Sequence, residues 1–208
     1  MSVVSKVQSW PKSDALFSQW IKAVNVAKHA CTDSRPQVRN HACVMLQQIL
    51  LSSYSMGHTG EQWGEVMKDV VLTTVNTLVT SVKKRKQQEY PEMDKTARIA
   101  VLMLSKVFLQ FLPSLAGLEC FTDIWLELLS ILDVATSCSG ESEELAEAVP
   151  EALKNMILVM AGDGILRPDW CDAKKNINLW NVTWQRARST SPNLEPGMLE
   201  AHGVAAGG

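Results

Sequence analysis

The chain has 208 residues, of which 46% are hydrophobic and 6% aromatic, and its formal net charge is −2. This length is enough to bury a sizeable core, and the near-neutral charge gives no general attraction to nucleic acid or to an anionic membrane. The longest uninterrupted apolar runs are about six residues, far below the roughly 20 that cross a bilayer. The first residues also lack the hydrophobic stretch of a signal peptide, so we expect a cytosolic protein.

Five cysteines are spread along the chain as Cys31, Cys43, Cys120, Cys138 and Cys171. Their odd number and wide spacing argue against a disulfide framework. Most of them fall on the apolar faces of expected helices, so we predict reduced, buried thiols.

The first two expected helices cover about residues 14–31 and 36–53, each with apolar residues on one face at helical spacing. The turn between them, residues 32–36, supplies a capping side chain and a proline suited to a first helical turn. The spacing of Asp33 and Arg39 resembles the second helix of a HEAT repeat. In that family the two residues stabilise the turn within a repeat and the contacts between neighbouring repeats.

A third helix is expected from a capping box at Thr59 and Gln62 to about residue 82, with a regular apolar face. A fourth, residues 94–112, is apolar around most of its circumference and is expected to stop at Pro113. Such a helix must be covered by neighbours on most sides, which makes it the centre of the predicted core.

Further helices are expected at about residues 118–137, 143–161 and 176–188. Pro150 lies inside the second of these and should bend it, because a mid-helix proline removes one backbone hydrogen bond. Paired as antiparallel hairpins, the helices predict an all-α fold, a HEAT/armadillo-like α-solenoid of about three helical hairpins plus a short capping helix. We expect residues 1–190 to form this domain and residues 191–208, which lack periodicity, to be a disordered tail.

Two pairs of residues, His29 with Cys31 and His41 with Cys43, suggest a zinc site. On a helix, positions i and i+2 point about 200° apart, so neither pair can face one metal ion jointly. There is also no C-x-x-C motif. Core thiols with imidazoles at the boundary of the core are the simpler interpretation, and we expect no metal site.

Catalytic motifs are equally absent from the sequence. No serine or cysteine lies in a recognisable nucleophile motif, and no glycine-rich loop has phosphate-binding spacing. The carboxylates of Glu143, Glu144 and Glu147 fall in the first turns of an expected helix, where they complement its dipole. We therefore expect no catalytic residue and no cofactor.

Two groups of residues are candidates for contact with a partner or a membrane. The basic run Lys83, Lys84, Arg85 and Lys86 could be a nuclear address or a contact for anionic lipids, although solvated cations at a helix C-terminus explain it more simply. Trp180 and Trp184, one turn apart, could form a binding hot spot or could seal the last apolar layer of the array.

Five segments, in order, closely resemble the C-terminal region of the large Golgi brefeldin A-resistance guanine nucleotide exchange factors for Arf GTPases. They are residues 33–39, 104–110, 124–133, 147–156, which includes the unusual in-helix Pro150, and 179–184. The resemblance covers roughly residues 30–190. It implies a HEAT-like region downstream of the catalytic domain, in proteins that cycle onto early Golgi membranes and load Arf with GTP.

In that family, nucleotide exchange depends on a separate helical domain carrying a glutamate in a Phe-Arg-Leu-Pro-Gly-Glu setting, which this chain lacks. The resemblance therefore implies a noncatalytic scaffold or regulatory region that acts in Golgi vesicle trafficking. Its partners would be other proteins, the rest of the exchange factor and a peripheral Golgi membrane, with Arf reached only through the absent domain. The localisation implied is cytoplasmic, cycling to the cis side of the Golgi.

Two alternatives belong to other functional classes. The first is an independent helical-repeat adaptor that binds a protein or peptide in its groove. The second is a small helical enzyme or metal protein. If the chain is separated from upstream repeats, an apolar side of its first helix would be exposed, and self-association is expected.

Overall fold

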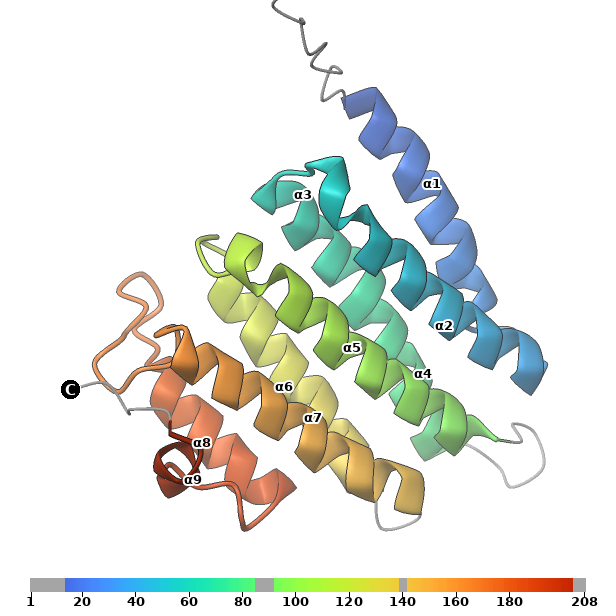
Figure 1. Cartoon of the computed structure of the whole chain (residues 1–208). Coiled ribbons are helices and arrows are strands. Elements are labelled where there is room, and N and C mark those ends of the chain that lie inside the picture. The colour runs from blue at the N-terminus through green and yellow to red at the C-terminus, as the bar shows by residue number, and fades with distance from the viewer. Residues whose placement is uncertain (1–13, 85–91, 139–141, 204–208) are drawn as a thin grey trace, which may run out of the picture.

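The structure, a computed structural model, describes residues 14–84, 92–138 and 142–203. These residues form helices connected by turns (Figure 1). The elements are α1 (Asp14–Ala30), α2 (Pro36–Ser52), η1 (Ser53–Met56), α3 (Gly60–Glu65), η2 (Val66–Leu72), α4 (Thr73–Lys84), α5 (Met93–Leu115), α6 (Phe121–Cys138), α7 (Glu143–Gly162), α8 (Leu179–Thr190) and α9 (Gly197–Ala201).

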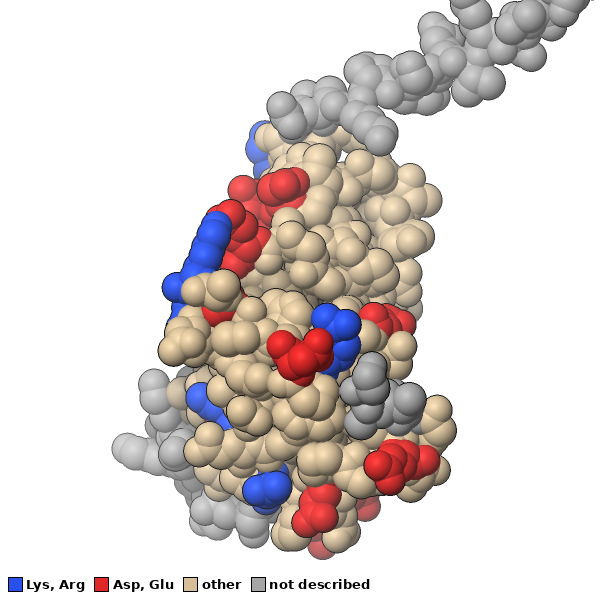
Figure 2. Space-filling view, turned by 90° about the vertical axis from the view of Figure 1, so that its left-hand side faces the viewer, with Lys and Arg blue, Asp and Glu red and all other residues tan. Residues whose placement is uncertain are grey.

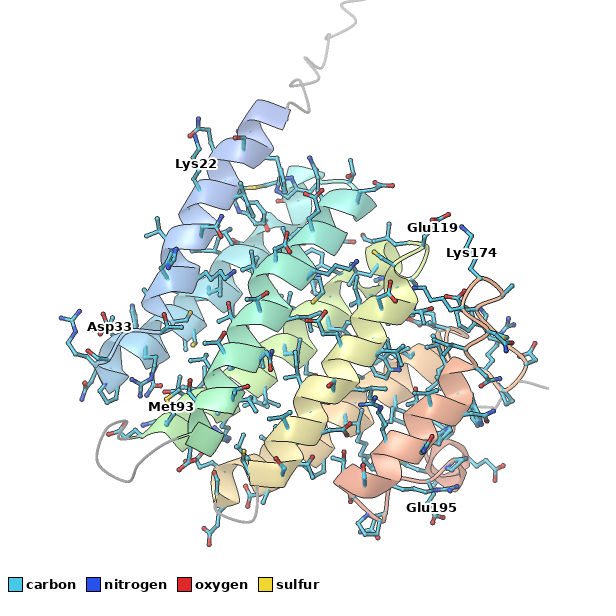
Figure 3. All side chains as sticks on the ribbon, turned by 180° about the vertical axis from the view of Figure 1, so that it is seen from behind. Lys22, Asp33, Met93, Glu119, Lys174 and Glu195 are labelled. Carbon is cyan, nitrogen blue, oxygen red and sulfur yellow. The ribbon has the colours of Figure 1, made fainter. Side chains whose placement is uncertain are left out.

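The helices lie in two layers, seen from opposite sides in Figures 1 and 3. Helices α2, α5 and α7 form one layer, and α1, the continuous α3–η2–α4 helix, α6 and α8 form the other. Within the described residues, successive helices pair as three antiparallel hairpins, and α8 covers α6 and α7 at the far end. The predicted all-α solenoid with a capping helix is confirmed.

Helix α5 is the centre of the core. It contacts α2 on one side, α7 on the other, and α4 in the second layer. Its length and composition would allow it to cross a membrane, but 56% of its most apolar window is buried inside the protein. A core helix of a stacked array requires the same composition, because neighbours cover it on most sides.

The third predicted helix begins where the sequence places it. Thr59 Oγ1 accepts from the backbone N–H of Gln62, and the Gln62 side chain accepts from the Thr59 N–H, which completes the capping box. The helix is not uniform, however, because η2 is a π-helix in which the Thr73 N–H bonds to the Lys68 carbonyl. The carbonyl of Asp69, inside this wide segment, accepts a hydrogen bond from Lys28 of α1.

Two boundaries differ from the prediction. Helix α5 does not stop at Pro113 but continues to Leu115, with the proline inside its last turn. A proline there removes only one backbone hydrogen bond, while the extra turn buries Leu115 completely. Helix α8 begins three residues later than expected, because the Asn178 side chain accepts from the Asn181 N–H and caps it.

The C-terminal segment also differs from the prediction of disorder over residues 191–208. Residues 191–203 are described, and they include the short helix α9. Leu194 and Leu199 are buried, so this segment packs on the array instead of leaving it. Two leucines in a Pro/Gly-rich stretch gave too weak a periodic signal to predict a helix, and residues 204–208 lie outside the described residues.

Candidate functional site

The turn between α1 and α2 is organised by Arg39, whose side chain is only 1% exposed. Its guanidinium donates hydrogen bonds to the carbonyls of Asp33 and Ser34 and to Thr96 Oγ1 of α5, at 2.9, 3.1 and 3.2 Å. One side chain therefore satisfies the turn and joins two neighbouring hairpins. This arrangement agrees with the role that the HEAT-like spacing of Asp33 and Arg39 predicts.

The Asp33 carboxylate in the same turn is bound by Arg35. It accepts hydrogen bonds from the Arg35 backbone N–H and from the guanidinium, at 2.9 to 3.0 Å. These bonds lower the pKa of Asp33 to about 2. Because Arg35 is 71% exposed, the pair is a surface ion pair that shapes the turn, and it is not a reactive carboxylate.

An aromatic cluster joins α1 to α3 at the other end of the first hairpin. His58 lies between the rings of Phe17, Trp20 and Trp63, with ring-centroid distances of 5.2, 4.7 and 5.7 Å. Trp63 in turn stacks on Phe111 of α5 at 3.5 Å. Burial lowers the pKa of His58, and its Nε2 atom is buried without a hydrogen-bond partner. The neutral imidazole is thus a packing element between hairpins.

Trp125 connects α6 to the capping helix α8. Its indole N–H donates to Thr183 Oγ1 at 2.8 Å, and both residues are buried. Nearby, the Arg186 guanidinium pairs with the Asp133 carboxylate at 2.5 Å. These bonds fix α8 against the last hairpin.

The long connection between α7 and α8 folds back onto the start of α6 through Asp172. Its carboxylate accepts from Thr122 Oγ1 at 2.7 Å and from the backbone N–H groups of Lys174 and Lys175. The Thr122 hydrogen bond is the main reason that the pKa of Asp172 is lowered. Figure 3 shows Lys174 beside Glu119, the carboxylate with which it pairs. No periodic pattern or motif in the sequence predicts this anchored loop.

Of the two predicted contact tryptophans, Trp184 is buried and Trp180 is half-buried. Their rings meet edge to face, with centroids 5.5 Å apart. Together with Pro196 they line a cavity of about 270 Å³, whose other described walls are Asn181, Gln185 and Arg188. Trp184 thus packs in the core, while the exposed part of Trp180 borders a small cavity with polar residues in its lining.

The basic run falls at the edge of the described residues. Lys83 and Lys84 are the last two residues of α4, and Arg85 and Lys86 lie outside the described residues. The side chains of this run lie outside what the structure describes, so its contact role stays a prediction.

The His-x-Cys pairs split across their helices as helical geometry predicts. His29 and His41 are exposed, whereas Cys31 and Cys43 are buried. A hydrogen bond with Cys43, and then burial, raise the pKa of the Cys31 thiol. Within the described ranges, no three His, Cys, Asp or Glu residues converge as a metal site would require.

An apolar groove lies along α1 and α2 at the outer edge of the array. Its volume is about 590 Å³. It is lined by Ala23, Val26, Ala27, Ala30, Gln37, Val38, His41, Ala42, Met45 and Ile49. Helical spacing predicts Val38, Ala42, Met45 and Ile49 on the buried apolar face of residues 36–53, but in the structure they line this groove and Met45 is exposed. The α1 side of the groove was not predicted, and the recurrence of Ala23, Ala27 and Ala30 is the signal that could have indicated it.

Charged side chains do not gather by sign on the face formed by the α3 end and the long connections. Figure 2 shows acidic and basic residues interspersed there among uncharged ones. A mixed surface of this kind gives no directional attraction to a polyanion.

A family model described as "GBF1-like, tetratrico peptide repeat region" matches residues 20–194. The chain belongs to this family. It is 31% identical over 185 residues to the "ARF guanine-nucleotide exchange factor GNOM" of Arabidopsis thaliana, covering 88% of this chain and 12% of that protein. It is 29% identical over 187 residues to the Arabidopsis "ARF guanine-nucleotide exchange factor GNL1", covering 88% of this chain and 13% of that protein.

A relative from Caenorhabditis elegans, the "Golgi-specific brefeldin A-resistance guanine nucleotide exchange factor 1 homolog", is 27% identical over 178 residues, covering 84% of this chain and 8% of that protein. No solved structure matches the chain. The chain thus corresponds to a small, helical-repeat part of large Arf exchange factors, as the resemblance in the sequence indicates. Both tetratricopeptide and HEAT repeats are stacked helical hairpins, so the family description agrees with the observed fold.

Proposed function

We propose that the chain is a noncatalytic C-terminal scaffold or regulatory region of a large Arf guanine nucleotide exchange factor acting in Golgi vesicle trafficking. The observation that carries this proposal is the family match over residues 20–194. The alignment with the Arabidopsis relative GNOM also covers 88% of this chain but only 12% of that protein. A region of this kind would support membrane recruitment or partner docking rather than nucleotide exchange.

The chemistry of the buried polar groups supports a scaffold role. Arg39, Thr96 and Thr183 are buried, and each is bonded to a group on a neighbouring helix. The carboxylates of Asp33 and Asp172 owe their lowered pKa values first to Arg35 and Thr122, respectively, at separate turns. Perturbed groups that converge in a cleft would instead indicate an active site.

The protein would be cytoplasmic and would cycle to Golgi membranes, on the cis side as the family implies. The proposed contacts with membrane or partner are the run Lys83, Lys84, Arg85 and Lys86 and the pair Trp180 and Trp184. Cations near a helix end suit anionic headgroups, and a half-buried tryptophan suits a protein partner. No cofactor or metal has a part in this proposal.

A nucleotide-release assay tests the noncatalytic assignment. The chain is mixed with Arf loaded with a fluorescent GDP analogue, and release is followed with the exchange domain of a relative as the positive control. We expect the rate to equal that of Arf alone. Acceleration that depends on the concentration of the chain would contradict the assignment.

Expression of the tagged chain in cells tests recruitment. We expect a fraction of the chain to colocalise with a cis-Golgi marker. Substituting all four residues of the basic run with glutamate should release that fraction. The matched control carries the same substitution at four exposed cations elsewhere, Lys22, Lys95, Lys106 and Arg167. Purely diffuse wild-type protein, or equal release by both variants, would count against recruitment through this run.

The second candidate function is an independent helical-repeat adaptor, which the apolar groove on α1 and α2 favours. The gene structure distinguishes the two. An exchange domain encoded upstream in the same transcript supports the scaffold role, and a transcript limited to this chain supports the adaptor.

A further inference from the structure

The groove between α1 and α2 is the outer side of the first hairpin, and its composition is that of an interior surface. Its lining includes four alanines together with Val26 and Met45, which are 72% and 39% exposed. Along the array, the equivalent side of each later hairpin is covered by the hairpin before it, since α2 packs on α5 and α5 packs on α7. The groove continues this series of interfaces by one more step, with no described element covering it.

The groove carries no charge of its own. None of the described residues that line it is Asp, Glu, Lys or Arg, and Gln37 and His41 are its polar members. When two identical surfaces meet about a twofold axis, residues near the axis face their own copies, so a charge there would face a like charge. An uncharged groove avoids that repulsion and loses little hydration when it is covered.

The opposite end of the array is closed in a different way. Leu194 and Leu199, in the segment that carries α9, are buried there. The outer side of α8 presents Asn181, Gln185 and Arg188, all exposed. In a head-to-tail stack, the apolar groove of one copy would meet the polar end of the next copy, which does not match it.

From these observations we propose that two copies of the chain associate groove to groove, α1 and α2 of one against α1 and α2 of the other, in a closed twofold dimer. In this arrangement Val26 and Met45 of each copy enter the groove of the other, as ridges of one helix fill grooves of the next. Because the far ends are capped, association stops at the dimer instead of producing fibres. The dimer is independent of the proposed role in an exchange factor.

Sedimentation equilibrium of the purified chain tests the proposal. At concentrations up to about 100 µM, we expect the mass to rise from 23.0 kDa toward twice that value and to stop there. The double variant Val26→Glu/Met45→Glu places carboxylates where the copies meet. Its dissociation constant should rise by more than about a hundredfold, because those charges would lose their water.

Two control variants distinguish association through the groove from nonspecific association through other exposed apolar residues. Val159→Glu changes a valine on α7 that is as exposed as Met45, at 39%, and should leave the dimer intact. Met45→Leu keeps the apolar wall and should also preserve it. Thermal melts establish that each variant is folded. A wild-type chain that stays monomeric, an assembly that grows beyond two copies, or a dimer that survives the double substitution would overturn the proposal.

Discussion

At the scale of single residues, Arg39 has the largest predicted effect on stability. Replacing it with methionine keeps much of the buried volume but leaves the carbonyls of Asp33 and Ser34 without their donor. We expect the free energy of unfolding in urea to fall by about 2–4 kcal/mol. The control, Arg35→Met, removes an exposed ion pair from the same turn and should change stability far less. Equal effects of the two substitutions would disprove the structural role of Arg39.

His58 makes a prediction about pH. Its pKa is lowered in the folded state because it is buried between aromatic rings, so the unfolded chain takes up its proton first as pH falls. The contribution of His58 is therefore complete above the unfolded pKa of about 6.5 and is lost as pH falls below it. We expect the melting temperature to drop between pH 7 and pH 5, and His58→Gln to flatten that slope. An unchanged slope in the variant would assign the effect to other groups.

At the scale of elements, the connection between α7 and α8 is anchored by one carboxylate. Asp172→Ala removes the acceptor for Thr122 and for the N–H groups of Lys174 and Lys175. Limited trypsin digestion followed by mass spectrometry should then show faster cleavage after these two lysines. Asp169→Ala, in the same connection, removes only an exposed pair with Arg167 and should cleave at the wild-type rate. Unchanged protection in Asp172→Ala would show that the anchor lies elsewhere.

Helix α9 allows a test of whether the C-terminal segment belongs to the fold. Leu199→Ala should cost about 2–4 kcal/mol of unfolding free energy, because Leu199 is fully buried. Its neighbour Glu200 is exposed, and Glu200→Ala should be nearly neutral. Urea denaturation curves of both variants provide the measurement. If Leu199→Ala leaves the unfolding free energy unchanged, the result would instead support the predicted disorder of this segment.

At the scale of the whole molecule, the array was predictable because each helix repeats its apolar positions over several turns. The capping box at Thr59 and the proline at the start of α2 also placed helix ends correctly. The prediction that α5 stops at Pro113 was wrong, because burial of Leu115 outweighs the one backbone hydrogen bond that the proline removes. The role of Asp172 could not be predicted, since its side-chain partner Thr122 lies 50 residues away in the chain and no periodicity connects the two.

The wide helical segment η2 has a consequence for changes in chain length. A π-segment is equivalent to an α-helix with one surplus residue, so losing Lys68 should tighten it and leave Val75 and Val79 facing the core. Losing Thr77, an exposed residue of α4, should instead rotate everything after it by about 100°. Circular dichroism melts should stay cooperative for the first deletion and broaden for the second. The segment would then be the place where this long helix tolerates a shortening of its sequence.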